Sequence, residues 1–295
     1  MSIGLTASLV AGSLMSSPAQ EPRPTPVWRT RTEAVWVFAT VTNQDGQPVA
    51  DLPQDAFRVF DDGAEQKITQ FGADRSPVSV GLVVDVSESM RGRRINVARS
   101  ALASFLNELA IEDEVFLLSF NHASRVDVGW MPPGSLHEPL ANVQPSGGTA
   151  IYDAVRSALP ELARRKHQRS ALVVISDGAD TASDTSLFDL RSDLRQSDAF
   201  VYALAIAGPN DRPSTRVNPE ALRAFTDETG GYTAVISDVA ELQRETARIA
   251  QELNHQYLIG YLAPRPADDK FHTIRVRAKD ETYRVRARRG YLATK

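Results

Sequence analysis

The stretch GLVVDVSESM, residues 81–90, begins as an apolar run and ends abruptly in hydroxyls and carboxylates. Its apolar part predicts a strand that is buried on both faces, as in a parallel sheet covered by helices: Val80, Leu82, Val83 and Val84. Asp85, Ser87 and Ser89 follow at every second position, so in a nearly extended loop their side chains can turn toward one point. All three offer oxygen, the ligand atom that hard cations such as Mg²⁺, Mn²⁺ and Ca²⁺ prefer.

Two other segments carry polar groups suited to the same site. Gly147-Gly148-Thr149 places a hydroxyl at the start of a predicted helix, where paired glycines let the backbone approach closely. A second apolar run, residues 171–175, ends in Ser176-Asp177-Gly178. Ligands of open α/β sheets bind beyond the carboxyl ends of the strands, so we expect these polar clusters at one sheet edge.

The pattern Asp85-x-Ser87-x-Ser89, followed by Thr149 and Asp177, resembles the metal-ion-dependent adhesion site of von Willebrand factor type A domains. The resemblance extends over residues 76–255 as an alternation of strands and helices. It implies that the two serines and the threonine contact the ion through neutral hydroxyls, while the aspartates bind it directly or through water. Taken singly, these fragments are also ordinary turn and helix-cap chemistry, and their occurrence together in the family's order favours the metal site.

Neutral ligands leave a divalent cation incompletely neutralised. The resemblance therefore implies that a partner protein supplies an Asp or Glu carboxylate as the missing ligand and the missing charge. Three neighbours are candidates for outer contacts around the ion: Glu88, Gly148 and Asp180. Glu88 is alternatively an outward-facing loop acid and Asp180 a solvated turn acid, while His122 lies near the same edge either as a contact or as a loop residue.

The composition excludes several classes of function. The chain has 295 residues, a net charge of −4 and no cysteine. The negative charge gives no support to nucleic-acid binding, and the absence of cysteine excludes disulfides, thiolate metal sites and a cysteine nucleophile. The length is sufficient for two domains.

The amino-terminal residues resemble a secretory signal. Residues 1–20 are mildly apolar and end in small residues, and the Pro-rich residues 21–33 predict an extended linker. No other segment is long and apolar enough to cross a membrane. We therefore expect a secreted or periplasmic protein.

The remaining chain predicts one α/β domain between two β-rich segments. Residues 34–75 carry alternating strands and a hairpin signal around Asp61-Asp62-Gly63, and residues 256–295 carry a second predicted hairpin, 273–278 with 283–287. Neither segment has enough apolar residues to fold alone. The predicted fold is a doubly wound, mostly parallel, Rossmann-like sheet at residues 76–255, inserted into a small β-sandwich built from both end segments.

The end segments also resemble the von Willebrand-related proteins of Acidobacteria and other bacteria, through Asp55-x-Phe57, Asp62-Gly63 and the final Arg289-Gly290-Tyr291. The basic run at 275–289 could attract an acidic surface, although such a run is usually the solvated face of a hairpin.

The sequence predicts a binding module rather than an enzyme. It contains neither a Gly-x-Ser-x-Gly elbow nor a Gly-x-x-x-x-Gly-Lys loop, and no general base is indicated beside the site. The predicted function is metal-dependent, adhesion-type protein binding in the bacterial cell envelope or exterior. Two alternatives stay open: metal-assisted hydrolysis, and a scaffold whose metal is only structural.

Overall fold

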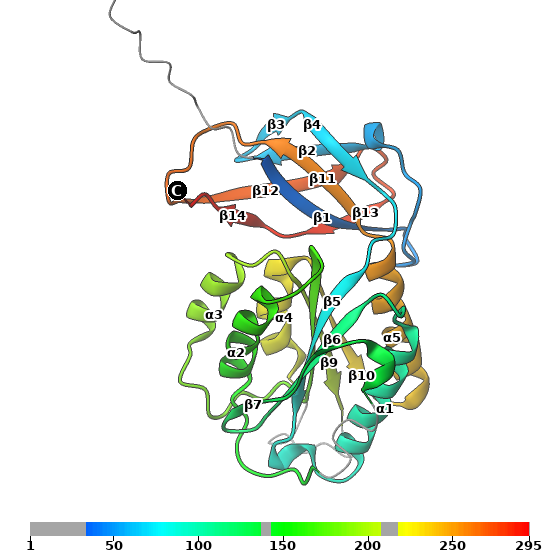
Figure 1. The fold of residues 1–295 in the computed structure, drawn as a ribbon, viewed down its shortest axis with the longest axis vertical. Coiled ribbons are helices and arrows are strands. Elements are labelled where there is room, and N and C mark those ends of the chain that lie inside the picture. Colours follow the sequence, from blue (N-terminus) through cyan, green and yellow to red (C-terminus); the bar gives the residue numbers. More distant parts are fainter. Residues whose placement is uncertain (1–33, 137–142, 208–217, 295) are drawn as a thin grey trace, which may run out of the picture. The chain divides into compact units, whose positions relative to one another are not determined.

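The computed structural model describes residues 34–136, 143–207 and 218–294 (Figure 1). The predicted signal sequence, residues 1–20, and the predicted linker, residues 21–33, lie outside these ranges. Among the described residues, no helix has the length and apolar content needed to cross a membrane.

The α/β part is built on a six-stranded sheet in the order β10-β9-β8-β5-β6-β7. Its strands are β5 (Val78–Asp85), β6 (Glu114–Phe120), β7 (Ser124–Met131), β8 (Arg169–Ser176), β9 (Phe200–Ile206) and β10 (Thr233–Ile236). All pairs are parallel except β6 with β7, which forms an antiparallel edge. The carboxyl end of β5 therefore lies in the middle of one sheet edge, between β6 and β8.

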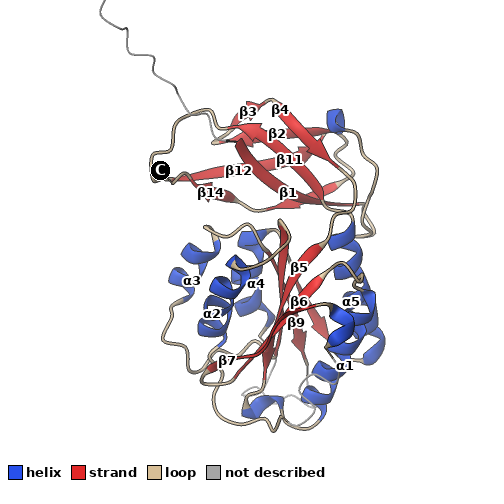
Figure 2. Cartoon of the chain, viewed as in Figure 1, coloured by secondary structure: helices blue, strands red, loops and turns tan. Residues whose placement is uncertain are grey.

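Helices cover both faces of this sheet (Figure 2). In the described ranges they are α1 (Arg93–Glu108), α2 (Ile151–Ala163), α3 (Leu187–Leu194), α4 (Pro219–Thr229) and α5 (Val239–Asn254). Leu82 and Val84 of β5 belong to the core under α1 and α5, whereas Val83 belongs to the core under α2, α3 and α4. Successive residues of β5 thus face opposite cores, which is why the strand has no polar alternation.

Gly81 allows close packing in the core under α2, α3 and α4. A Cβ atom at this position would lie 2.5 Å from the side chains of Leu172 and Phe116. Only the absence of a side chain lets these two large residues meet over the central strand.

The segments on either side of the α/β part form two antiparallel sheets, ordered β13-β1-β11-β4 and β14-β12-β2-β3. Their strands are β1 (Ala34–Thr42), β2 (Phe57–Asp61), β3 (Ala64–Gln66), β4 (Ile68–Gly72), β11 (Tyr257–Leu262), β12 (Phe271–Ala278), β13 (Arg284–Ala287) and β14 (Gly290–Leu292). Inward-facing residues of both sheets share one core, with Val37 and Ile259 from the first and Val59 and Val276 from the second. The predicted fold class is therefore confirmed.

The hairpin predicted at Asp61-Asp62-Gly63 is confirmed, since it joins β2 to β3. The chain then crosses to the other sheet, where β4 pairs with β11. The predicted hairpin of 273–278 with 283–287 is wrong, because β12 pairs with β2 and β14 while β13 pairs with β1. A local hairpin of β12 with β13 would leave one edge of β1 and one edge of β2 without a partner. Placing β13 beside β1 in one sheet and β12 beside β2 in the other gives both edges a partner.

Short 3-10 turns complete the described structure: Gln54–Ala56, Glu88–Met90 and Pro133–Ser135. The helix predicted to start at Thr149 begins two residues later, as α2 starts at Ile151. Thr149 consequently precedes the helix, and its side chain does not cap it.

Candidate metal centre

The loop after β5 brings its two serine hydroxyls together. The Oγ atoms of Ser87 and Ser89 are 3.1 Å apart, and the turn Glu88–Met90 holds them in this arrangement. Ser87 is fully buried and Ser89 is half-buried. The pair therefore lies at the boundary between the interior and the surface.

The Asp85 side chain stabilises this loop through hydrogen bonds. Its carboxylate accepts hydrogen bonds from the Ser87 N–H at 2.8 Å and from the Ser176 hydroxyl at 2.6 Å. Because desolvation penalises the charged form more than these hydrogen bonds favour it, the pKa of Asp85 is raised to about 6. The hydrogen bond from Ser176 joins the ends of β5 and β8, a contact that the sequence pattern alone did not reveal.

The loop before α2 is attached to the serine loop through the backbone. The Glu88 N–H donates to the Gly147 carbonyl at 3.0 Å, two residues before Thr149. The backbone of Thr149 is fixed in turn, since its N–H donates to the Thr181 hydroxyl at 3.0 Å and its carbonyl accepts from the Thr181 N–H at 2.8 Å. The structure thus brings Thr149 to the same edge as Ser87 and buries it.

The paired glycines are required by close contacts. Gly147 has φ +79°, and a Cβ atom there would lie 2.5 Å from Nδ1 of His122. A Cβ atom at Gly148 would lie 3.2 Å from the Cβ of Ala182. His122 therefore packs against the loop that carries Thr149, and Gly148 acts by letting the 181–182 loop approach.

Arg94 connects the first loop to the third. Its Nη1 donates to the Ser89 carbonyl at 2.9 Å and to Oδ2 of Asp177 at 3.0 Å, and both side chains are almost completely buried. Arg94 is not among the residues predicted from the sequence. The signal was its position: Arg94 lies four residues before Ala98, on the face of α1 that the apolar residues bury.

The two acidic neighbours have other roles in the structure. Glu88 is exposed and its carboxylate is 3.0 Å from the Arg91 guanidinium, a surface pair of little energetic value. Asp180 accepts from the Ile151 N–H at 2.9 Å and from the Ser183 hydroxyl at 2.6 Å. Asp180 therefore satisfies the first turn of α2, where free N–H groups need acceptors.

The family model described as von Willebrand factor type A domain matches residues 80–179, the segment that contains every candidate ligand. The chain contains a von Willebrand factor type A domain. Among curated proteins, human inter-alpha-trypsin inhibitor heavy chain H4 is 28% identical over 153 residues, which cover 46% of this chain and 16% of that protein. The chain thus matches less than a fifth of this relative's length.

Solved structures share the fold of this von Willebrand domain. A von Willebrand factor type A protein from Catenulispora acidiphila has a TM-score of 0.50 and 12% identity, covering 92% of this chain and 75% of that one. The corresponding domain of the type V pili tip protein Mfa5 from Porphyromonas gingivalis has a TM-score of 0.50 and 15% identity, covering 62% and 96%. An aerotolerance-related membrane protein from Bacteroides fragilis has a TM-score of 0.51 and 20% identity, covering 60% and 98%.

The residues at the edge of the von Willebrand domain fit a hard divalent cation. They offer hydroxyl and carboxylate oxygens from three loops and no sulfur, the donor set that suits Mg²⁺, Mn²⁺ or Ca²⁺. Charge also fits: the carboxylates of Asp85 and Asp177 and the guanidinium of Arg94 sum to −1. A bound divalent ion would bring the net charge of the site to +1, and it would offset the desolvation cost of the buried Asp85 carboxylate.

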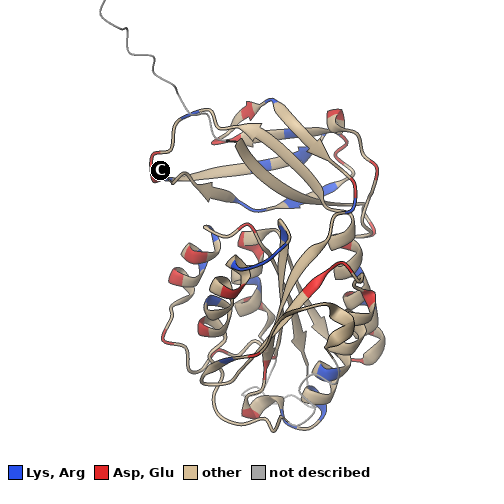
Figure 3. Ribbon diagram, viewed as in Figure 1, with Lys and Arg blue, Asp and Glu red and all other residues tan. Residues whose placement is uncertain are grey.

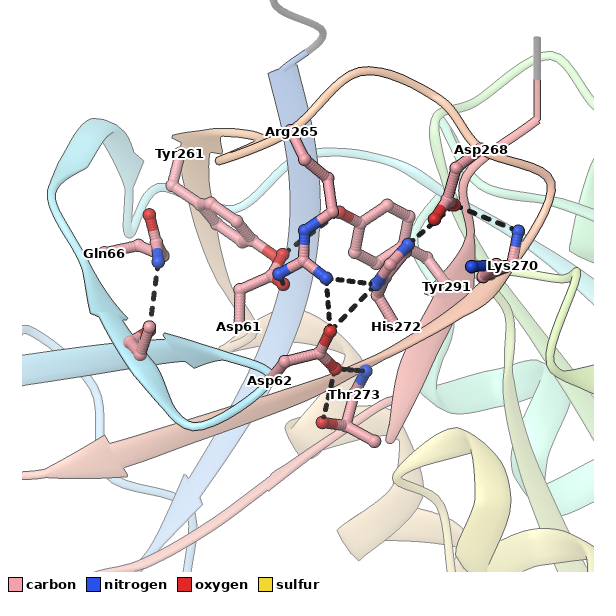
Figure 4. A network of polar contacts seen from close by, with 11 residues as sticks. Asp61, Asp62, Gln66, Tyr261, Arg265, Asp268, Lys270, His272, Thr273 and Tyr291 are labelled. Carbon is pink, nitrogen blue, oxygen red and sulfur yellow. Dashed lines mark hydrogen bonds and ion pairs between the residues drawn. The ribbon is translucent and has the colours of Figure 1, made fainter.

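A second cluster lies in the β-sandwich, outside the von Willebrand domain (Figure 4). Ligand atoms of Asp61, Asp62 and His272 lie within 4.8 Å of one another, close enough to hold one ion. The guanidinium of Arg265 already contacts both carboxylates there, and the Tyr261 hydroxyl donates to Asp61 at 2.8 Å. The Arg265 guanidinium and the His272 ring already hydrogen-bond the carboxylates of this cluster, so it is a connected polar network as well as a group that could hold an ion.

Proposed function

We propose that the von Willebrand domain binds a partner protein through a divalent cation, Mg²⁺ or alternatively Mn²⁺ or Ca²⁺. The residues that hold the ion are Asp85, Ser87, Ser89, Thr149 and Asp177. The observation that carries the proposal is the convergence of three loops at one sheet edge. The hydroxyls of Ser87 and Ser89 lie 3.1 Å apart, the hydrogen bond to Gly147 brings in the second loop, and Arg94 joins the third.

The partner supplies a carboxylate from Asp or Glu. Hydroxyl ligands add no negative charge, so the occupied site would carry a net charge of +1. An anionic oxygen ligand completes the coordination and neutralises this charge, whereas a neutral group does only the former. The interaction is therefore metal-dependent and depends on one acidic side chain of the partner.

The proposal is for binding and not for catalysis. The Asp85 carboxylate accepts hydrogen bonds from the Ser176 hydroxyl and the Ser87 backbone N–H, and the Asp177 carboxylate accepts one from the Arg94 guanidinium. An arginine stays protonated and a serine without a basic neighbour stays neutral, so neither adds a general base beside the ligand carboxylates themselves. If a phosphatase and esterase panel with Mg²⁺ and Mn²⁺ gave turnover that Asp85→Asn removes, this part of the proposal would be wrong.

We place the protein in the cell envelope or exterior of a bacterium as an adhesion-type module. Supporting this, residues 1–20 resemble a signal sequence, and the fold is shared with a pili tip protein and with a protein described as a membrane protein. Detection of residues 34–295 in the periplasmic or culture-fluid fraction of the native host, and not in the cytoplasm, tests this placement.

The first experiment measures the metal by itself. Titration calorimetry with Mg²⁺ and with Mn²⁺ should give one site in the native protein and none in Ser87→Ala or Thr149→Val. Glu88→Gln is the matched control, because this exposed residue lies between the two serines without a direct contact to either hydroxyl. Equal metal affinity in all four proteins would overturn the assignment of the ligands.

The second experiment measures the partner. Purified protein immobilised in Mg²⁺ should retain an envelope protein that is released by chelator and is not retained by Asp85→Ala, provided that this variant keeps a native circular dichroism spectrum. Replacing single Asp and Glu residues of the retained protein by Asn and Gln should then abolish binding at one position. If chelation only lowers the melting temperature and leaves retention unchanged, the metal is structural and the proposal fails.

A further inference from the structure

The basic run at 275–289 is divided between two sheets and does not form one solvated face. Arg275 and Arg277 are on β12 in one sheet, whereas Val285 and Ala287 of β13 belong to the other. Between these strands lies a groove of about 730 Å³. Its remaining lining residues come from the adjoining β2 region, from β12 and from the crossing after β13: Phe60, Gly63, Thr273, Ile274, Val276, Arg288 and Arg289.

The groove combines an apolar floor with a cationic rim. Ile274 and Val276 are buried and form the floor, while Arg275 and Arg277 are exposed on the rim. Figure 3 marks the basic positions along β12. On a chain with a net charge of −4, this is a local concentration of positive charge.

These two arginines have no acidic partner among the described residues. Other arginines of the sandwich are neutralised, as Arg58 is by Glu65 and Arg265 by Asp61. Arg277 instead lies 5.7 Å from the centre of the Phe60 ring, a contact that holds the side chain without neutralising it. The uncompensated charge of the rim therefore favours an anionic ligand.

The backbone at the groove favours an extended peptide. Residues 274–278 of β12 pair with β2 on one edge. On the other edge β14 pairs with residues 271–273 and the Ile274 N–H donates to the Arg289 carbonyl at 2.8 Å, so the edge is open only after this N–H. β13 is also the last strand of its sheet. Strand edges of this kind accept an additional strand through main-chain hydrogen bonds, and residues 275–278 of β12 give a length of about 13 Å at roughly 3.3 Å per residue.

We propose that the groove between β12 and β13 binds an extended acidic segment of a partner protein, whose backbone pairs with a strand edge and whose carboxylates contact Arg275 and Arg277. The apolar floor takes the alternate side chains of the segment. A nucleic acid or an acidic polysaccharide would use the charge alone and would leave the strand edge and the floor unused. This site is independent of the cation site, so it binds in the presence of chelator.

The test uses a fluorescent eight-residue peptide of alternating Glu and Val, with anisotropy measured in chelator. We expect saturable binding that weakens as salt is added, and no binding of the same peptide with Gln in place of Glu. The variant Arg275→Gln/Arg277→Gln should bind at least about ten-fold more weakly. The control Lys67→Gln/Arg244→Gln removes two exposed charges that line no part of the groove and should change the affinity less than about two-fold.

Several outcomes would overturn the proposal. They are absence of saturable binding up to about 1 mM peptide, equal losses in the two double variants, and equal binding of the Gln peptide. A heparin oligosaccharide of the same charge that displaces the peptide and binds more tightly would assign the groove to polyanions instead. Melting temperatures of all variants within about 2 °C of the native protein ensure that a loss of binding is not a loss of folding.

Discussion

Substitution of Arg94 separates two effects of its positive charge, which stabilises the protein without metal and weakens its affinity for a metal ion. Its guanidinium is 3.0 Å from the Asp177 carboxylate, with side chains 7% and 3% exposed. In chelator, Arg94→Met leaves the Asp177 carboxylate buried without a counter-charge. We expect the free energy of unfolding to fall by about 3–5 kcal/mol.

The same variant, Arg94→Met, should bind the metal ion more tightly than the native protein. A guanidinium and a divalent ion that share one carboxylate are on the order of 5 Å apart, and Coulomb's law gives a repulsion of roughly 7 kcal/mol at an effective dielectric constant of about 20. If only a third of this repulsion is effective, Arg94→Met binds the ion about 2 kcal/mol more tightly, or roughly 30-fold. Metal therefore restores stability to the variant more than it adds to the native protein.

Titration calorimetry with Mn²⁺ measures the affinity, and urea unfolding with and without metal measures the stability. Arg94→Lys is the matched control because it keeps the charge, and its metal affinity should stay close to the native value. If folded Arg94→Met bound metal no more tightly than the native protein, or if Arg94→Lys showed the same gain, the assignment of Arg94 as a competing charge would be wrong.

Three further predictions concern packing and the polar network of the sandwich. Gly81→Ala should lower the free energy of unfolding by about 1–3 kcal/mol or more, because the new Cβ would lie 2.5 Å from the Phe116 ring, and an unchanged urea midpoint would contradict this. Asp61→Asn weakens a buried acceptor of two tyrosine hydroxyls and one guanidinium, so we expect a loss of about 1–3 kcal/mol in thermal unfolding, and none if the network adds no stability. Hydrogen bonding to Asp62 first, and to a second carboxylate, raises the pKa of His272 above 6.5, so this stabilisation is complete below pH 6.5 and is lost as the pH rises through the folded-state pKa. As the pH rises above 6.5, the urea midpoint should fall in the native protein and fall less in His272→Gln. An equal dependence of the urea midpoint on pH in the two proteins would refute this role of His272.

Local patterning was sufficient for the α/β domain. The apolar run at 80–84 followed by alternate oxygen ligands predicts both a central strand and a site at its end, because burial on both faces removes the alternation and because polar groups cannot continue into the core. The same reasoning predicted the alternation of strands and helices. It also selected Thr149 and Asp177 as candidate ligands, since both follow local signals.

Contacts between distant residues could not be read in this way. Arg94 reaches Asp177 across 83 positions and Ser176 reaches Asp85 across 91, and neither pair has a spacing that marks it in the sequence. The Asp61 network likewise joins β2 to side chains some 200 positions later. Such pairs exist only because the sheet order brings the strand ends together.

The sequence by itself determined the elements, the order of the candidate ligands and the origin of the sandwich in both ends of the chain, because periodicity and local polarity report which residues are buried. The tertiary structure alone decided which strands are neighbours. Strand 273–278 and strand 284–287 have the pattern of a hairpin, yet each pairs with an amino-terminal strand whose edge would otherwise be open. Hydrogen bonding within a sheet is satisfied globally, and this choice converts a predicted solvated face into the groove beside Arg275 and Arg277.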